Sequence, residues 1–285
     1  MSDLGSFESV FRRALRTRYE YEDISLQNIL VITDLEEEEE SSFLTLLKQY
    51  LKPKLVGDAF EFTVFGRKQF APWSHLRARI DQINPDLIIS YRMLWVEDIT
   101  APKSLGSYID LLSQDTDFPL LVMPHPRLHD MKEVLDKPGA ILVASEHAYA
   151  NHHQVNYSLN FVEDGAPLVL VHIEDEDTFE YYMDSIEKIP ALDTEVARDS
   201  LHDQLLAGPL HYAESVEEYI RQNFPNIDIQ THITFGHLIT AYQELLHSQL
   251  VDLLVTNTKD DTQLAMHSIG YSLAVEFRQT PVLLL

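Results

Sequence analysis

The chain of 285 residues contains no cysteine. This absence excludes disulfide bonds, thiolate catalysis and cysteine-ligated metal or iron–sulfur sites, although it does not by itself identify a compartment. Basic residues are also few: 21 Lys and Arg stand against 46 Asp and Glu, which gives a formal net charge of −25. Because a field of that sign repels phosphate backbones and anionic lipid, we expect neither nucleic acid nor membrane as a partner.

Long apolar runs are missing as well. No stretch approaches the roughly 20 apolar residues that a membrane span needs. The N-terminal residues (MSDLGSFESVFRRAL) lack the continuous apolar core of a signal peptide, so we expect a cytoplasmic protein. Hydrophobic residues still make up 45% of the chain, and aromatic residues 10%, which is enough for a substantial core.

Three short motifs occur twice in the chain, in the same order. The pairs share apolar runs of strand length and similar flanking residues: 28–34 with 139–146, 84–91 with 250–257, and 104–123 with 268–285. The runs of the first pair end in a carboxylate, Asp34 or Glu146. The repetition predicts two copies of one unit, over residues 1–130 and 135–285.

Helical segments separate the predicted strands. Residues 237–250 (HLITAYQELLHSQL) place Leu and Ala at the spacings of one helical face, and residues 73–83 (WSHLRARIDQI) do the same in the first copy. Alternating strands and helices predict an α/β fold with two tandem, doubly wound, Rossmann-like parallel sheets. Between its first and fourth strands the second copy has two further strand candidates, 166–177 and 227–236, but the first copy has only 60–66. We therefore expect the first unit to be shorter by about one strand and one helix.

This order of strands, helices and closing small-residue turns resembles the universal stress protein family, here as a tandem pair that covers nearly the whole chain. In the ATP-binding branch of that family, the fourth strand is followed by Gly, two residues, Gly, nine residues and Gly-Ser or Gly-Thr. The glycines let main-chain N–H groups approach the phosphates, and the last small residue opens a helix whose N-terminus favours anions.

That loop is degenerate in both copies. The first copy keeps Gly106-Ser107 but has Met93 and Val96 where the leading glycines belong. In the second copy, an ungapped count from Pro281 places Val255, Thr258 and Ser268 at the three glycine positions, whereas a register through Gly270 places Asn257 and Asp260 at the first two. Asp260 and Asp261 also bring negative charge toward a triphosphate. We therefore expect ATP binding to be lost and no cofactor to be bound.

The alternative is that the second unit binds ATP, AMP or another small molecule. The predicted ligand-binding residues follow the strand ends or belong to the degenerate loops: Asp34, Gly106, Ser107, Glu146, His147, Gly236, Asn257, Ser268 and Gly270.

Several histidines invite a metal or a catalytic role. His152 and His153 are adjacent and splay apart on a helix, whereas paired ligands usually lie three or four residues apart, so we expect no metal site. His172 reads as a strand residue hydrogen-bonded in or near the pocket. No nucleophile–base arrangement stands out, and we expect no enzyme, with an α/β hydrolase as the last-ranked alternative.

Two charged segments bear on partners. Residues 7–20 (FESVFRRALRTRYE) combine an apolar helical stripe with four arginines, which favours a helix docked on the chain's own acidic surface over a detachable partner-binding helix. Residues 174–189 (EDEDTFEYYMDSIEKI) predict an acidic helix start rather than a mobile flap.

The closing strands bear on assembly. Single units of the resembling family commonly dimerise through the last strand, so in a tandem chain residues 119–123 and 281–285 are expected to pair as an intramolecular pseudo-dimer. A homodimer of two such chains is an additional alternative. The leading hypothesis is a non-enzymatic stress-response protein that binds an unknown protein or small ligand.

Overall fold

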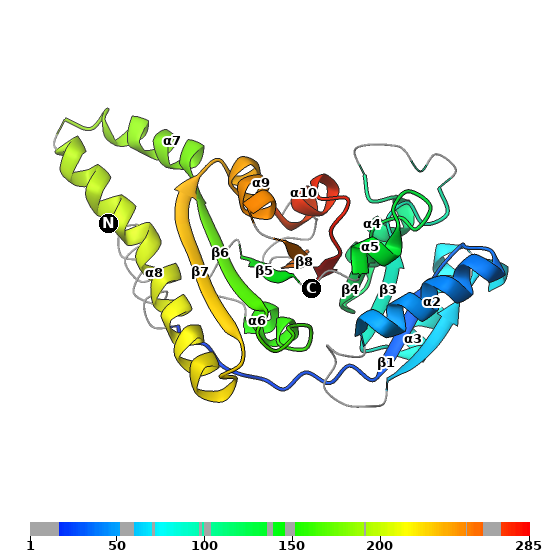
Figure 1. The fold of residues 1–285 in the computed structure, drawn as a ribbon. Coiled ribbons are helices and arrows are strands. Elements are labelled where there is room, and N and C mark those ends of the chain that lie inside the picture. The colour runs from blue at the N-terminus through cyan, green and yellow to red at the C-terminus, as the bar shows by residue number, and fades with distance from the viewer. Residues whose placement is uncertain are drawn as a thin grey trace.

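The computed structural model describes residues 17–51, 60–69, 72–96, 99, 104–135, 139–145, 152–190, 192–248, 250–258 and 269–285. These residues form one nine-stranded sheet with the strand order β2-β1-β3-β4-β9-β8-β5-β6-β7. Every neighbouring pair is parallel except β4 and β9, which pair antiparallel. We call residues 17–135 the first half and residues 139–285 the second half. The predicted α/β class is confirmed (Figure 1).

The first half contributes four strands among its described residues: β1 (Asn28–Ile32), β2 (Glu61–Phe65), β3 (Leu87–Tyr91) and β4 (Leu120–Met123). Its helices alternate with them: α2 (Glu37–Leu51), the short 3-10 helix η1 (Arg67–Gln69), α3 (Trp73–Ile83), α4 (Ser107–Asp115) and α5 (Met131–Leu135).

The second half contributes five strands: β5 (Ala140–Ala144), β6 (Pro167–Asp175), β7 (Asp228–Gly236), β8 (Val251–Thr256) and β9 (Val282–Leu284). Its helices are α6 (His152–Ser158), α7 (Glu176–Ile186), α8 (Thr194–Asn223), α9 (Leu238–Ser248) and α10 (Ile269–Glu276). The first half is therefore one strand narrower in the described part of the chain, as the sequence predicted. The boundaries of the two predicted units remain a prediction.

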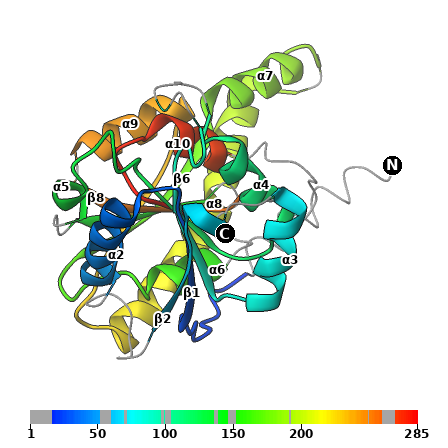
Figure 2. The same ribbon diagram turned by 90° about the vertical axis from the view of Figure 1, so that its right-hand side faces the viewer.

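The central strands are buried on both faces. All residues of β3, β4, β5 and β9 are buried, which matches their continuous apolar runs. Figures 1 and 2 show α9 and α10 on one face of the second-half sheet and α6 on the other. Helices on both faces are what right-handed crossovers between parallel strands produce.

The junction between the halves is the antiparallel pair β4–β9, in which Leu121 lies opposite Leu283. These strands fall within residues 119–123 and 281–285, the segments expected to pair. Side chains reinforce the junction, because the Tyr271 hydroxyl donates to Asp110 Oδ1 at 3.2 Å. This pairing converts two apolar edge strands into interior strands.

The acidic run that begins at residue 174 starts a helix, as predicted. Strand β6 ends at Asp175, whose side chain accepts a hydrogen bond from the main-chain N–H of Asp177, and α7 follows. Figures 1 and 2 show α7 and the adjoining end of α8 projecting from the sheet as an arm.

The predicted N-terminal helix over residues 7–20 falls mostly outside the described residues. Residues 17–20 are described and are not helical, which corrects that part of the prediction. The main-chain N–H of Tyr19 donates to Ser215 Oγ at 2.8 Å, and Arg18 pairs with Glu218 at 2.7 Å, so tertiary contacts with α8 replace local helix formation. Among the described helices, none combines the length and apolar character needed to cross a membrane.

Candidate functional site

Two crevices are expected where the strand order reverses in each half, since open α/β sheets bind ligands outside the carboxyl ends of strands at such points. In the first half this point lies between β1 and β3, and in the second half between β5 and β8. The predicted carboxylate positions, Asp34 and Glu146, follow the first strand of each pair.

Asp34 in the first crevice is bound by the chain itself. The Tyr91 hydroxyl donates to Asp34 Oδ1, and the main-chain N–H of Trp95 donates to Asp34 Oδ2 at 3.2 Å. The Tyr91 oxygen also accepts from the main-chain N–H of Asp34 at 2.8 Å and lies 3.1 Å from Thr33 Oγ1. Burial, followed by the Asp34 contact, raises the pKa of Tyr91 well above its ordinary value, so the phenol stays a donor.

The loop after β3 adopts glycine-like conformations without glycine. Met93 and Trp95 have φ angles of 59° and 53°. The loop also folds on itself: the N–H of Met93 donates to Leu105 O at 2.7 Å and that of Val96 to Met93 O at 3.1 Å. These main-chain donors are therefore already used within the protein.

Gly106 and Ser107 lie where the resemblance places the end of the phosphate loop, at the start of α4. Gly106 has a φ of +98°, and a Cβ at this position would lie 2.9 Å from Met93 Cα. Its N–H donates to Ser104 Oγ at 2.8 Å. The glycine thus permits close packing of the loop against Met93.

A histidine that the sequence did not single out completes the first crevice. His125 follows β4, is 2% exposed, and its ring meets that of Tyr91 edge-on with centroids 5.2 Å apart. Its Nδ1 accepts from the main-chain N–H of Arg127 at 3.1 Å, which makes Nε2 the protonated nitrogen of the neutral ring. Burial lowers the pKa of His125, although the nearby Asp34 charge opposes that shift.

At the rim of the first crevice, Arg127 pairs with Glu39 at 2.8 Å, and this hydrogen bond lowers the pKa of Glu39.

The predicted residues of the second half are only partly described. Glu146, His147 and Ser268 lie outside the described residues. Gly236 ends β7, and β5 and β6 lie between β7 and β8, so the structure does not bring Gly236 next to Asn257 at the end of β8. Gly270 does approach this strand end: a Cβ there would lie 2.6 Å from Thr256 Oγ1.

The hydrogen-bond register corrects both alignments of the second loop. The N–H of Thr258 donates to Leu285 O at 2.8 Å, just as the N–H of Arg92 donates to Met123 O at 3.1 Å. Thr258 is therefore the counterpart of Arg92, and the counterpart of Met93 is residue 259, which is not described. Counting back from Pro281 gave the wrong register because the segment between strand and proline is shorter in the second half.

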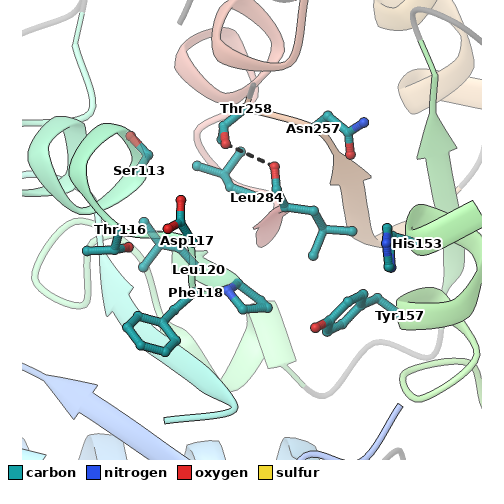
Figure 3. A pocket seen from close by; sticks show the side chains of 12 residues that line it. Ser113, Thr116, Asp117, Phe118, Leu120, His153, Tyr157, Asn257, Thr258 and Leu284 are labelled. Carbon is teal, nitrogen blue, oxygen red and sulfur yellow. Dashed lines mark hydrogen bonds between the residues drawn. The ribbon is translucent and has the colours of Figure 1, made fainter. Parts of the chain in front are cut away.

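A cavity of about 280 Å³ lies between the halves, beside the ends of β8 and β9 (Figure 3). The second half supplies the ends of β8 and β9 and one side of α6, and the first half supplies the segment before β4. The lining residues are Ser113, Thr116, Asp117, Phe118, Pro119, Leu120, His153, Tyr157, Asn257, Thr258, Leu284 and Leu285. Of the predicted site residues, Asn257 is the one that this cavity includes. Sequence reasoning missed Asp117 and Tyr157, because their approach depends on the β4–β9 pairing.

The ring nitrogens of His172 and His152 lie within hydrogen-bond distance of other groups of the protein. His172 is a buried strand residue whose Nδ1 lies 3.0 Å from Ser145 O and whose Nε2 lies 2.9 Å from Glu174 Oε1, so the prediction of a hydrogen-bonded strand histidine is confirmed. His152 Nδ1 lies 3.3 Å from the Tyr212 hydroxyl. Within the described part of the chain, no group of three or more His, Asp or Glu side chains could hold a metal ion.

Comparison with known proteins gives likeness of fold at low identity. No known family profile matches the chain, and no curated protein sequence matches it. Among solved structures, a universal stress protein from Archaeoglobus fulgidus is 14% identical, with a TM-score of 0.49 over 92% of this chain and 97% of the other. A protein of unknown function from Pseudomonas aeruginosa is also 14% identical, with a TM-score of 0.47 over 91% of this chain and 92% of the other.

Proposed function

We propose that this chain is a non-enzymatic stress-response protein of the universal stress protein type, which acts in the cytoplasm by binding a protein or a small ligand and does not bind ATP in its first half. The observation that supports the loss of ATP binding is the internal hydrogen bonding of the described residues that follow β3. The main-chain N–H groups of Met93, Trp95, Val96 and Gly106 all donate within the protein.

Phosphate recognition by such a loop requires main-chain donors that point at the ligand. To bind a nucleotide here, the first half would have to break several internal hydrogen bonds, each with a net value of about 1 kcal/mol. It would also have to accept phosphate beside the Asp34 carboxylate. One like charge at close range costs on the order of 1 kcal/mol even when partly solvated.

The bonding of the polar side chains also supports a role without catalysis. Both ring nitrogens of His172 have partners within the protein, so this ring directs no lone pair at a substrate. A general base needs a lone pair directed at its substrate. We therefore place an α/β hydrolase last among the alternatives.

Small-ligand binding in the second half is the second candidate. The cavity lined by Asn257 favours it, since Asn257 follows the carboxyl end of β8, and open α/β sheets bind ligands outside the carboxyl ends of their strands.

Thermal unfolding with millimolar ATP, AMP and Mg²⁺ tests the proposal, because a ligand at about 100 times its Kd adds roughly 2.7 kcal/mol to stability. We expect that no nucleotide raises the unfolding temperature by binding to the first half. The Asn257→Leu variant serves as the control, since it obstructs the second cavity and leaves the first half unchanged. A shift with ATP that persists in this variant would overturn the proposed loss of nucleotide binding in the first half, whereas a shift that it abolishes would establish the second candidate.

A further inference from the structure

We infer that the cavity between the halves binds a small organic cation, namely a protonated amine on a compact apolar body. This inference rests on the proposed ligand binding in the second half and goes beyond it by naming the ligand class.

The cavity has two walls of different origin. Figure 3 shows Asp117 and Phe118 from the first half on one side, and His153, Tyr157 and Asn257 from the second half on the other. Leu120 and Leu284 add aliphatic surface. A ligand placed here would contact both halves, so the site exists only because β4 and β9 pair.

The aromatic rings suit a cation. Phe118 and Tyr157 are both partly buried, and both line the cavity. An ammonium group near the face of such a ring gains about 0.5–1 kcal/mol at exposed sites and about 2 kcal/mol when it is desolvated. The same rings offer apolar contact to the body of the ligand.

The charged residues around the cavity also favour a cationic ligand. Among the described residues that line it there is neither Lys nor Arg, and Asp117 contributes a carboxylate. Glu22 Oε2 lies 4.0 Å from His153 Nδ1. The pKa of Tyr157 is raised first by burial and then by the negative charges of Asp86 and Glu22, which shows that acidic groups act on this wall as well. An anionic ligand would meet repulsion from both sides.

Hydrogen bonding adds selectivity for an amine. An ammonium group has three donors and no acceptor, so it is matched by oxygen acceptors. A carboxylate offers about four acceptor positions, so contacts with neighbouring residues do not exhaust Asp117. The Asn257 side chain adds a polar amide to the lining. The volume of about 280 Å³ lies at the lower end of ligand pockets, which limits the ligand to roughly one ring and a short chain.

Calorimetric titration of the full chain with three probes of similar shape tests this inference. The probes are 2-phenylethylammonium, the neutral 2-phenylethanol and the anionic 3-phenylpropionate. We expect the ammonium to bind about tenfold more tightly than the alcohol and the anion to bind more weakly than both. The preference should weaken in high salt, because the Asp117 carboxylate is exposed to solvent.

Two variants and a control locate the site. Asp117→Asn should remove most of the preference for the ammonium, and Phe118→Leu should weaken both the ammonium and the alcohol. Glu214→Gln removes an exposed carboxylate on α8, outside the cavity lining, and should change nothing. The folded state of each variant is checked by its unfolding transition.

Equal affinity for ammonium and alcohol, or an unchanged preference in Asp117→Asn, would overturn the inference. Binding of AMP or ATP without binding of the ammonium would also overturn it, while leaving small-ligand binding in the second half intact. If no probe and no nucleotide binds, both the inference and that second candidate function are wrong.

Discussion

The guanidinium of Arg92, just after β3, donates a hydrogen bond of 2.8 Å to the main-chain oxygen of Ala274 in α10. It also donates to Phe277 O at 2.7 Å and to Thr280 O at 3.0 Å. A cation from the first half thus caps the C-terminal end of a helix in the second half, where carbonyl groups lack partners. Burial lowers the pKa of Arg92 to about 9, which still leaves the group charged at neutral pH.

Arg92→Met is expected to lower the free energy of unfolding by about 3 kcal/mol, because it removes several hydrogen bonds from a charged donor to buried carbonyls. The free energy of unfolding of Arg92→Lys should lie between those of Arg92→Met and the parent protein, since an ammonium cannot reproduce the planar set of guanidinium donors. The exposed Arg221, paired with Glu217 at 2.8 Å, provides the control, and Arg221→Met should cost less than about 1 kcal/mol. Denaturant unfolding measures the stability of all three variants. Equal losses of unfolding free energy in Arg92→Met and Arg221→Met would contradict the capping role.

Gly106→Ala is expected to destabilise the first half by about 2–3 kcal/mol. Its φ of +98° disfavours any L side chain, and the added Cβ would lie 2.9 Å from Met93 Cα. Gly165 also has a positive φ, +80°, but nothing lies within 4 Å of its Cβ position. Gly165→Ala therefore measures the conformational cost alone, about 1 kcal/mol. A thermal unfolding midpoint that falls equally in both variants would show that loop packing against Met93 is unimportant.

The central strands were predictable because each is a short apolar run. In β3, for example, five consecutive buried residues leave no helical periodicity. The closing strands were predictable because each follows a proline at the end of a repeated motif, and β4 and β9 differ from that prediction only at their ends.

The contacts of the site were not predictable, because they depend on register and on distances across the fold. The Tyr91 hydroxyl reaches Asp34 only because β1 and β3 are neighbours with Val31 opposite Ile89. Arg92 is a charged residue directly after a strand, yet it is 5% exposed, because its partners Ala274, Phe277 and Thr280 belong to the other half. The second loop was misaligned because its length differs between the halves, which spacing from Pro281 could not reveal.

Stability is expected to fall in mild acid. Burial lowers the pKa of His125, His129 and His152 below the ordinary value of 6.5. As pH falls below 6.5, these histidines take up protons in the unfolded chain before they do so in the folded protein, so the free energy of unfolding decreases. Above that pH both states are neutral and the effect vanishes. The slope reaches at most about 1.4 kcal/mol per pH unit for each histidine.

His125→Gln should reduce this slope between pH 7 and pH 5, because one of the three groups no longer titrates. The matched control is His75→Gln, which makes the same substitution at an exposed histidine and should change stability at neutral pH by less than about 0.5 kcal/mol. Denaturant unfolding at several pH values measures the slope. An identical slope in the parent and in His125→Gln would mean that His125 titrates alike in the folded and unfolded states.

Tyr91→Phe is expected to lower the free energy of unfolding by about 2 kcal/mol. The substitution keeps the ring but removes the oxygen that bonds to the main-chain N–H and the carboxylate of Asp34 and lies beside Thr33. Tyr21→Phe is the control, since the Tyr21 hydroxyl also faces a carboxylate, Asp23 at 3.3 Å, but at a side chain that is 39% exposed. That change should cost less than about 0.5 kcal/mol, because water replaces an exposed hydrogen bond. Equal losses in the two variants would show that the Asp34–Tyr91 contact is as solvated as a surface contact, and the first crevice would then be open rather than closed.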